Sequence, residues 1–104
     1  MATWFITGCS TGFGRALAEA VLADDHRAVI TARDPAQLSD LVDQYPDTAL
    51  ALPLDVTDQR QIDEAANATL QRFECVDVLV NNAGYGYRAA VEEATPAEID
   101  RLFA

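Results

Sequence analysis

A glycine-rich turn between an apolar segment and a helical pattern limits the possible folds most strongly. The turn reads T-G-C-S-T-G-F-G over residues 7–14, follows the apolar run Thr3–Thr7 and leads directly into apolar residues at helical spacing. Gly8 would allow a tight turn, Gly12 a close approach of the backbone to a ligand, and Gly14 close packing of the helix against the strand. The pattern therefore predicts a strand, a turn and a helix in close succession.

The rest of the chain alternates short apolar runs with helical patterns. The runs are rich in Val, Ile and Leu, as expected for strands that are buried on both faces of a sheet. The predicted strands are Thr3–Thr7, Ala28–Ala32, Ala49–Leu54 and Val76–Val80, and helical patterns lie between them. This alternation predicts right-handed crossovers. We therefore expect a Rossmann-type, three-layer α/β/α fold with a doubly wound parallel sheet of strand order 3-2-1-4.

Capping residues mark where the helices begin. Asp34 precedes a proline, and Asp58 lies three positions before Gln61, so both aspartates are predicted N-caps. Thr95 predicts the start of a further helix close to the end of the chain. No linker or repeat is recognisable, and we expect residues 1–104 to form one incomplete domain. The outer edge of the fourth strand would then lack a partner, which predicts self-association.

The charge balance excludes several classes of partner. The chain has seven arginines, no lysine and 17 acidic residues, giving a net charge of −10. Such a chain repels nucleic acid and anionic membranes, so neither is expected as a partner. An anionic ligand would need a locally favourable site, such as a helix N-terminus or a well-placed arginine.

Cysteine and histidine are too few for most metal or thiol chemistry. Cys9 and Cys75 lack the spacing of a disulfide framework or a zinc site, which fits a reducing cytoplasm. Cys9 and the single histidine, His26, flank a helix of about a dozen residues, which separates them by roughly 18 Å. No metal site is therefore expected. Without a targeting signal or a long apolar stretch, the protein is predicted to be soluble and cytoplasmic.

A strand, a glycine-rich turn and a helix in this order are typical of a dinucleotide-binding site. Free N–H groups at the start of the helix would face the diphosphate. Where an acid usually binds the ribose 2′-hydroxyl of NAD, this chain has Ala32 and Arg33. A small residue leaves room for a 2′-phosphate and a guanidinium can bind it, so NADP(H) is preferred, with NAD(H) possible. Alternatively, Asp34 reaches the ribose and Arg33 lies on the surface.

The spacing T-G-x-x-x-G-x-G resembles that of the short-chain dehydrogenase/reductase family. L-D-V-T at 54–57 and N-N-A-G at 81–84 are similar to further motifs of that family, and the resemblance covers the chain from residue 3 to its end. It implies the cofactor-binding front half of such an enzyme. The implied cofactor-binding residues are Gly8, Ser10, Thr11, Gly12, Phe13, Gly14, Arg33, Asp55, Val56, Asn82, Ala83 and Gly84.

Within that set, the resemblance implies that Asp55 and Val56 lie beside the adenine, whereas Asn81 has a structural role between strands. For Asp55 alone, a turn or helix-capping aspartate is the alternative. The chain departs from the family where Glu74 and Cys75 replace the usual glycine after the third helix. A helix without a C-terminal glycine must end in another way.

The resemblance implies hydride transfer between a nicotinamide and a small carbonyl or alcohol substrate, assisted by a tyrosine, a lysine, a serine and an asparagine. The chain has no lysine, and Tyr45, Tyr85 and Tyr87 do not lie in a Tyr-x-x-x-Lys pattern. We therefore predict no catalytic residue among these 104 positions and no activity of the chain alone. Two alternatives remain, a non-catalytic nucleotide-binding module and a half-domain that completes its sheet with another chain.

Overall fold

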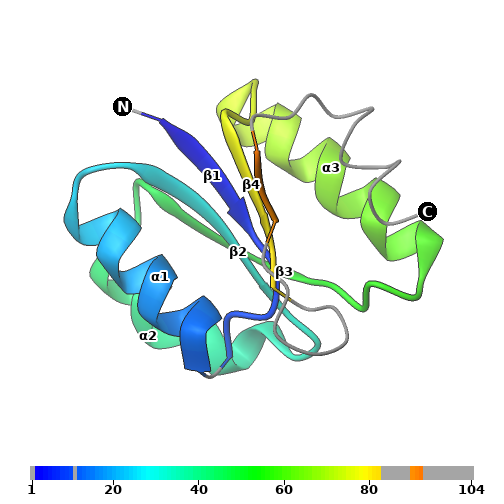
Figure 1. Cartoon of the computed structure of the whole chain (residues 1–104), viewed down its shortest axis with the longest axis horizontal. Helices are drawn as coiled ribbons and strands as arrows, with labels where there is room; N and C mark the ends of the chain where they lie inside the picture. Colours follow the sequence, from blue (N-terminus) through cyan, green and yellow to red (C-terminus); the bar gives the residue numbers. More distant parts are fainter. Residues whose placement is uncertain (1, 11, 83–89, 93–104) are drawn as a thin grey trace.

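The computed structural model describes residues 2–10, 12–82 and 90–92, which build one sheet with helices on both faces (Figure 1). In chain order the elements are β1 (Thr3–Ile6), α1 (Gly12–Ala23), β2 (Arg27–Ala32), the 3-10 helix η1 (Pro35–Leu38), α2 (Ser39–Gln44), β3 (Ala49–Pro53), α3 (Gln59–Phe73), β4 (Val78–Asn81) and β5 (Ala90–Glu92). The strands are arranged in the order β3-β2-β1-β4-β5.

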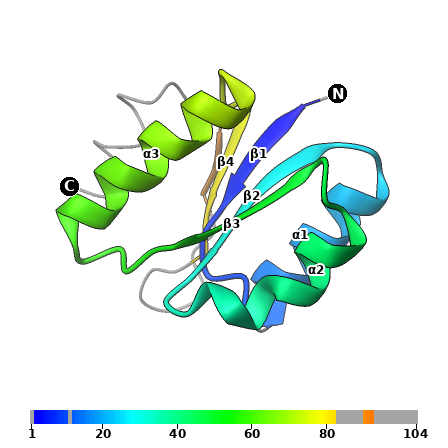
Figure 2. The ribbon, with the colours of Figure 1, turned by 180° about the vertical axis from the view of Figure 1, so that it is seen from behind.

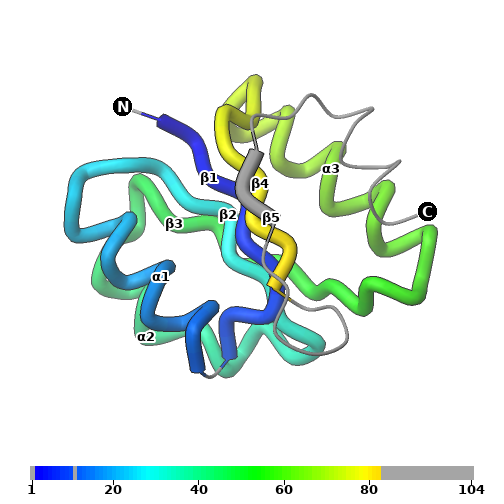
Figure 3. The backbone as a smooth tube through the Cα atoms, in the orientation of Figure 1, coloured from blue at the N-terminus to red at the C-terminus, as the bar shows by residue number. Residues whose placement is uncertain are grey.

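Four strands are parallel and confirm the predicted order 3-2-1-4. In the centre, Phe5 of β1 lies opposite Val29 of β2 on one side and opposite Leu79 of β4 on the other. On the far side of β2, Val29 lies opposite Leu50 of β3. The path of these strands can be followed in Figure 3. Their carboxyl ends therefore meet at one edge of the sheet, where a parallel α/β sheet usually binds its ligand.

The expectation of an unpaired edge on the fourth strand is wrong. β5 pairs with β4 in antiparallel orientation, with Val91 opposite Val80 and Ala90 opposite Asn81. A rule that derives parallel strands from helical crossovers cannot predict a short antiparallel strand. The edge of β4 on which the expectation of self-association rested is therefore covered by β5.

The helices divide between the two faces, as predicted. α1 and α2 cover one face and α3 covers the other, seen from opposite sides in Figures 1 and 2. Successive residues of a strand point to opposite faces. Ile6 and Ile30 accordingly pack in one core with Ala18, Leu22 and Leu41, whereas Phe5 and Val29 pack in the other with Ile62, Phe73 and Leu79.

Strand boundaries differ from the prediction by one or two residues. Thr7 and Leu54 follow their strands, and β4 begins at Val78 instead of Val76. Both Leu54 and Val76 are nevertheless buried. The apolar pattern reports burial and not pairing, so it extends past the paired residues.

Both predicted aspartate caps are confirmed. The Asp34 carboxylate accepts a hydrogen bond from Ala36 N at 3.0 Å, and that of Asp58 accepts from Arg60 N at 3.0 Å and from Gln61 N at 3.4 Å. The predicted helix at Thr95 lies outside the described residues. No helix of the described part is long and apolar enough to cross a membrane.

Helix α3 ends without glycine because Glu74 itself adopts the left-handed conformation. Its φ is 70°, and its N–H donates to Leu70 O at 2.9 Å. This conformation closes the last turn of the helix and directs the chain towards β4. A residue with a Cβ is strained in this conformation, and here that residue is exposed.

Candidate functional site

A cavity of about 370 Å³ lies at the carboxyl ends of the parallel strands. The segments after β1, β2 and β3 form its walls. It is lined by Gly8, Ser10, Ala32, Arg33, Asp34, Gln37, Leu54 and Val56. Residues from three neighbouring strands thus meet at one site, although up to 48 positions separate them in the chain.

The glycine-rich turn has the conformation that the sequence predicts. Gly8 and Gly12 have φ values of 68° and 66°, in the region that favours glycine. A Cβ on Gly14 would lie 2.1 Å from the carbonyl oxygen of Gly8 and 2.7 Å from Nδ2 of Asn82. The first turn of α1 therefore packs against the loop backbone at a distance that only glycine permits. At Gly12, by contrast, a Cβ would meet nothing within 4 Å, so that side of the turn is open.

The end of β4 is tied to this turn by a small hydrogen-bond network. Asn82 N donates to the Thr7 hydroxyl at 2.8 Å, and that hydroxyl lies 3.3 Å from Oδ1 of Asn81. The Asn82 amide donates to Gly8 O at 3.3 Å. These contacts agree with the structural role expected for Asn81. They also give Asn82 a role in holding the turn, in addition to its predicted place beside a cofactor.

Arg33 and Asp34 follow β2, and their side chains differ in their hydrogen bonds. Arg33 is exposed on the cavity wall, and its side chain makes no hydrogen bond or ion pair within the described ranges. Asp34 also lines the cavity, but its Oδ1 accepts from Ala36 N as the cap of η1. Ala32, beside them, is buried and small. A guanidinium is therefore available at the cavity, while one oxygen of the neighbouring carboxylate is engaged in the cap of η1.

Asp55 and Val56 follow β3. Oδ1 of Asp55 accepts hydrogen bonds from Thr57 N at 2.9 Å and from the Thr57 hydroxyl at 2.6 Å. The Thr57 hydroxyl, the Thr57 N–H and the positive charge of Arg33 hold the pKa of Asp55 below its usual value. Asp55 is therefore ionised near neutral pH and forms the turn predicted as the alternative. Oδ2 has no hydrogen bond in the described structure, so the turn leaves one oxygen for a ligand.

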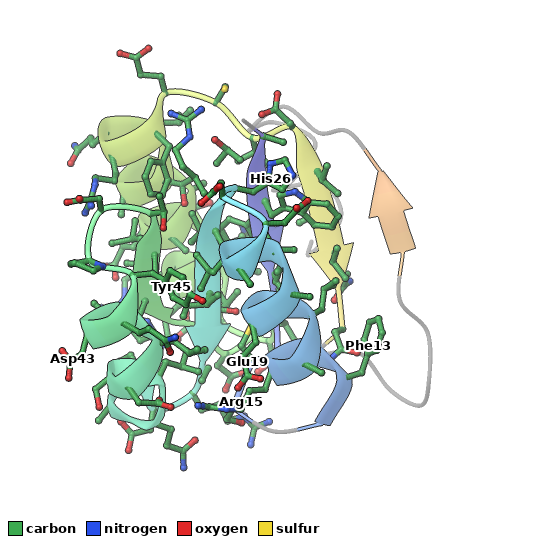
Figure 4. The ribbon with its side chains drawn as sticks, turned by 90° about the vertical axis from the view of Figure 1, so that its left-hand side faces the viewer. Phe13, Arg15, Glu19, His26, Asp43 and Tyr45 are labelled. Carbon is green, nitrogen blue, oxygen red and sulfur yellow. The ribbon has the colours of Figure 1, made fainter. Side chains whose placement is uncertain are left out.

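At the start of α1, the side chain of Phe13 is exposed, whereas that of Arg15 forms ion pairs. Phe13 is 59% exposed and, among the described positions, is the only large apolar residue that is exposed. Arg15 is paired with Glu19 and with Asp40 of α2 and donates to Gln37 O at 3.4 Å. Figure 4 shows Arg15 and Glu19 together on α1, with Phe13 further along its N-terminal end. Arg15 thus joins α1 to the η1 segment that forms one cavity wall.

Cys9 and His26 are not brought together. Cys9 is buried, and this burial raises the pKa of its thiol to about 11. His26 lies at the opposite end of α1 from Phe13 (Figure 4), where its Nδ1 accepts from Ala2 N at 2.9 Å. The thiol is therefore protonated at neutral pH and has no base beside it. The described ranges contain no group of three or more His, Cys, Asp or Glu side chains that could hold a metal ion.

The cavity unites Gly8, Ser10, Arg33 and Val56 from the predicted set. Gly12, Phe13, Gly14, Asp55 and Asn82 lie in the same turns without lining it, and Thr11, Ala83 and Gly84 lie outside the described residues. Gln37 and Leu54 also line the cavity but were not predicted to do so. The pattern assigned them to a helix start and a strand, and neither signal indicates which way a side chain points.

Known proteins are similar to this chain in both sequence and fold. The family described as short chain dehydrogenase matches residues 2–104. The oxidoreductase calM of Penicillium decumbens is 45% identical over 106 residues, covering 98% of this chain and 34% of that protein. A short-chain dehydrogenase of Streptomyces avermitilis has 49% identity and a TM-score of 0.72, with 76% of this chain and 30% of that chain covered.

Two further relatives carry cofactor names. The NADP-dependent 3-hydroxy acid dehydrogenase YdfG of Salmonella typhi is 31% identical, covering 85% of this chain and 38% of that protein. A 3-ketoacyl-(acyl-carrier-protein) reductase of Brucella melitensis, solved in complex with NADH, has 32% identity and a TM-score of 0.70. The matched region covers 75% of this chain and 32% of the Brucella melitensis chain. The chain thus spans about a third of the length of these relatives, one of which is named as NADP-dependent and one of which was solved with NADH.

Proposed function

Since this chain belongs to the short-chain dehydrogenase family, we propose that its cavity binds the adenosine half of a nicotinamide dinucleotide, with NADP(H) preferred over NAD(H). We propose further that the whole protein is an oxidoreductase acting on a small carbonyl or alcohol. The bound cofactor would supply or accept the hydride. The residues described here bind and orient it.

The observation that carries the cofactor preference is the guanidinium of Arg33 at the cavity, which makes no hydrogen bond or ion pair with the part of the chain that the structure describes. In a chain of net charge −10, an arginine on a cavity wall that makes no ion pair with any acid of the described residues is matched to an anionic ligand. The small side chain of Ala32 leaves room beside the guanidinium. Asp34 Oδ1 accepts the N–H of Ala36 as the cap of η1, which directs this oxygen to the helix start.

The glycine-rich turn fits the diphosphate of such a cofactor. The first turn of α1 contains no acidic residue, so the positive end of its dipole is not neutralised by the chain itself. The space around Gly12 is open, and its positive φ turns the backbone towards the start of the helix. The residues of the glycine-rich turn therefore fit the diphosphate of a nicotinamide dinucleotide. Asp55 Oδ2 could accept from the adenine amino group.

Titration with NADPH and NADH tests the proposal directly. We expect Arg33→Ala to weaken NADPH binding roughly tenfold or more, because a hydrogen bond to a charged group contributes about 1.5–3 kcal/mol. Binding of NADH, which lacks the 2′-phosphate, should change by less than about twofold. The assay is the fluorescence of the reduced nicotinamide in the presence of the purified 104-residue chain.

Arg60→Ala provides a matched control. Arg60 is exposed on α3, and its Nε lies 3.9 Å from Oε1 of Glu64, which is a long ion pair. The variant therefore removes the same charge as Arg33→Ala at a residue that does not line the cavity. It should affect both nucleotides weakly and equally. Equal weakening of NADPH binding by the two variants would mean that only net charge matters, and tighter binding of NADH by the wild-type chain would refute the NADP(H) preference.

A further inference from the structure

The loop after β3 is held by hydrogen bonds on each side of Asp55. Asp55 N donates to Oε1 of Gln61 at 2.8 Å, and Asp55 O accepts from Asp58 N at 2.9 Å. The carboxylate of Asp55 is held by Thr57. Val56, the next residue, lines the cavity. Gln61 lies in the first turn of α3, and its side chain accepts this backbone N–H.

This arrangement differs from an ordinary capping box. In a capping box, the third helical residue accepts from the backbone N–H of the N-cap, which here would be Asp58. The Asp58 N–H instead donates to Asp55 O, and the Gln61 side chain reaches back six positions to Asp55 N. The glutamine therefore fixes the segment that faces the cavity and does not complete the helix cap.

The packing of α3 does not depend on this contact. Ile62, Ala65 and Phe73 are buried in the core between α3 and the sheet, and Asp58 caps the helix by itself. Removing the acceptor at Gln61 would leave a half-buried N–H without its partner. The effect should therefore be local to the 55–58 loop and leave the fold intact.

From these contacts we infer that Gln61 is a positioning residue for the adenosine half of the dinucleotide, acting through the backbone of Asp55 to hold the turn at Asp55 and, next to it, Val56, which lines the cavity. The inference rests on the proposed function. It concerns the adenosine common to NADP(H) and NAD(H), whereas Arg33 distinguishes the two. Gln61 does not itself line the cavity.

Gln61→Met tests this role, since methionine keeps the length and helix propensity of glutamine but lacks a strong acceptor. We expect binding of NADPH, NADH and 2′,5′-ADP to weaken by the same factor, roughly three- to tenfold, corresponding to one net hydrogen bond. Gln61→Glu restores an acceptor and should recover NADH binding to within about twofold. Hydrogen exchange at the Asp55 amide should accelerate in the methionine variant without nucleotide.

Gln59→Met is the matched control, because Gln59 lies in the same turn but its side chain donates to the exposed Asp63 and not to the Asp55 loop. It should bind all three nucleotides like the wild-type chain. The positioning role is overturned if Gln61→Met binds 2′,5′-ADP with unchanged affinity, if Gln59→Met loses as much, or if Gln61→Glu recovers nothing. A wild-type chain that binds none of the nucleotides would instead refute the proposed function, and this role with it.

Discussion

Gly14→Ala should strongly destabilise the protein, although alanine is the better helix former. In an exposed helix interior this substitution stabilises by about 1 kcal/mol. Here the added Cβ would lie 2.1 Å from the oxygen and 2.9 Å from the carbonyl carbon of Gly8. Both atoms belong to the backbone of a turn that is itself held by Asn82, so they cannot move away by rotating a side chain.

The expected cost follows from that geometry. Ordinary contact begins near 3.4 Å, so α1 must move away from the turn by more than 1 Å. Overpacking a well-packed site costs about 1–3 kcal/mol and occasionally more. Because the clash is with backbone, we expect a net loss of about 3 kcal/mol. For a domain of this size, that loss should lower Tm by more than about 10 °C.

Thermal unfolding followed by far-ultraviolet circular dichroism measures this loss without any nucleotide. Gly12→Ala is the comparison, because its Cβ would meet nothing within 4 Å and only the positive φ is strained, at about 1–2 kcal/mol. Ala16→Gly, on the exposed side of the same helix, calibrates helix propensity. A Gly14→Ala variant that unfolds at or above the wild-type temperature would refute the reasoning.

Three further predictions follow from single residues. Glu74→Gly should raise stability by about 1 kcal/mol in urea unfolding, since glycine adopts a φ of 70° without strain, whereas Glu74→Ala should bring no such gain. A thiol reagent at pH 8 should label the exposed Cys75 but not Cys9, because Cys9 is buried and its pKa is raised to about 11. Mass spectrometry of the folded chain should then show one label, and two labels would contradict the burial of Cys9. The pKa of Asp55 is lower in the folded than in the unfolded protein, mainly because its carboxylate accepts from the Thr57 hydroxyl. The ionised carboxylate therefore stabilises the fold fully above the unfolded-state pKa of about 3.8, and this stabilisation is lost as the pH falls through the lower folded-state pKa. Thr57→Val should therefore destabilise at pH 7, and a difference from wild type that persists unchanged in strong acid would count against the hydrogen bond as its cause.

Glycine spacing and apolar runs were enough to predict the parallel sheet and the conformation of its first turn. Gly8, Gly12 and Gly14 each have a conformational or steric requirement that other residues do not meet, so their positions carry structural information. Asp34 and Asp58 were equally informative, because a cap is a contact between residues two or three positions apart. Such local constraints can be recognised in one sequence.

Contacts that depend on the folded arrangement were not predictable in the same way. The partner of Gln61 could have been Asp58 or Asp55, and only the path of the loop decides between them. The antiparallel β5 has three residues and no periodic pattern of its own. Likewise, the spacing of Glu74 from the helix start gave no sign that it would adopt a left-handed conformation. Tertiary geometry determined each of these outcomes.

The exposed position of Arg33 on the cavity wall has a consequence for the kinetics of binding. The charge of −10 acts at long range and should slow the diffusional encounter with any anionic nucleotide. Arg33 acts only at contact and should instead lengthen the lifetime of the complex. Added salt shortens the Debye length to about 10 Å at 0.1 M and weakens both effects. Association and dissociation would therefore both accelerate with ionic strength, while the ratio of the two rates, and with it the affinity, would vary much less than either rate.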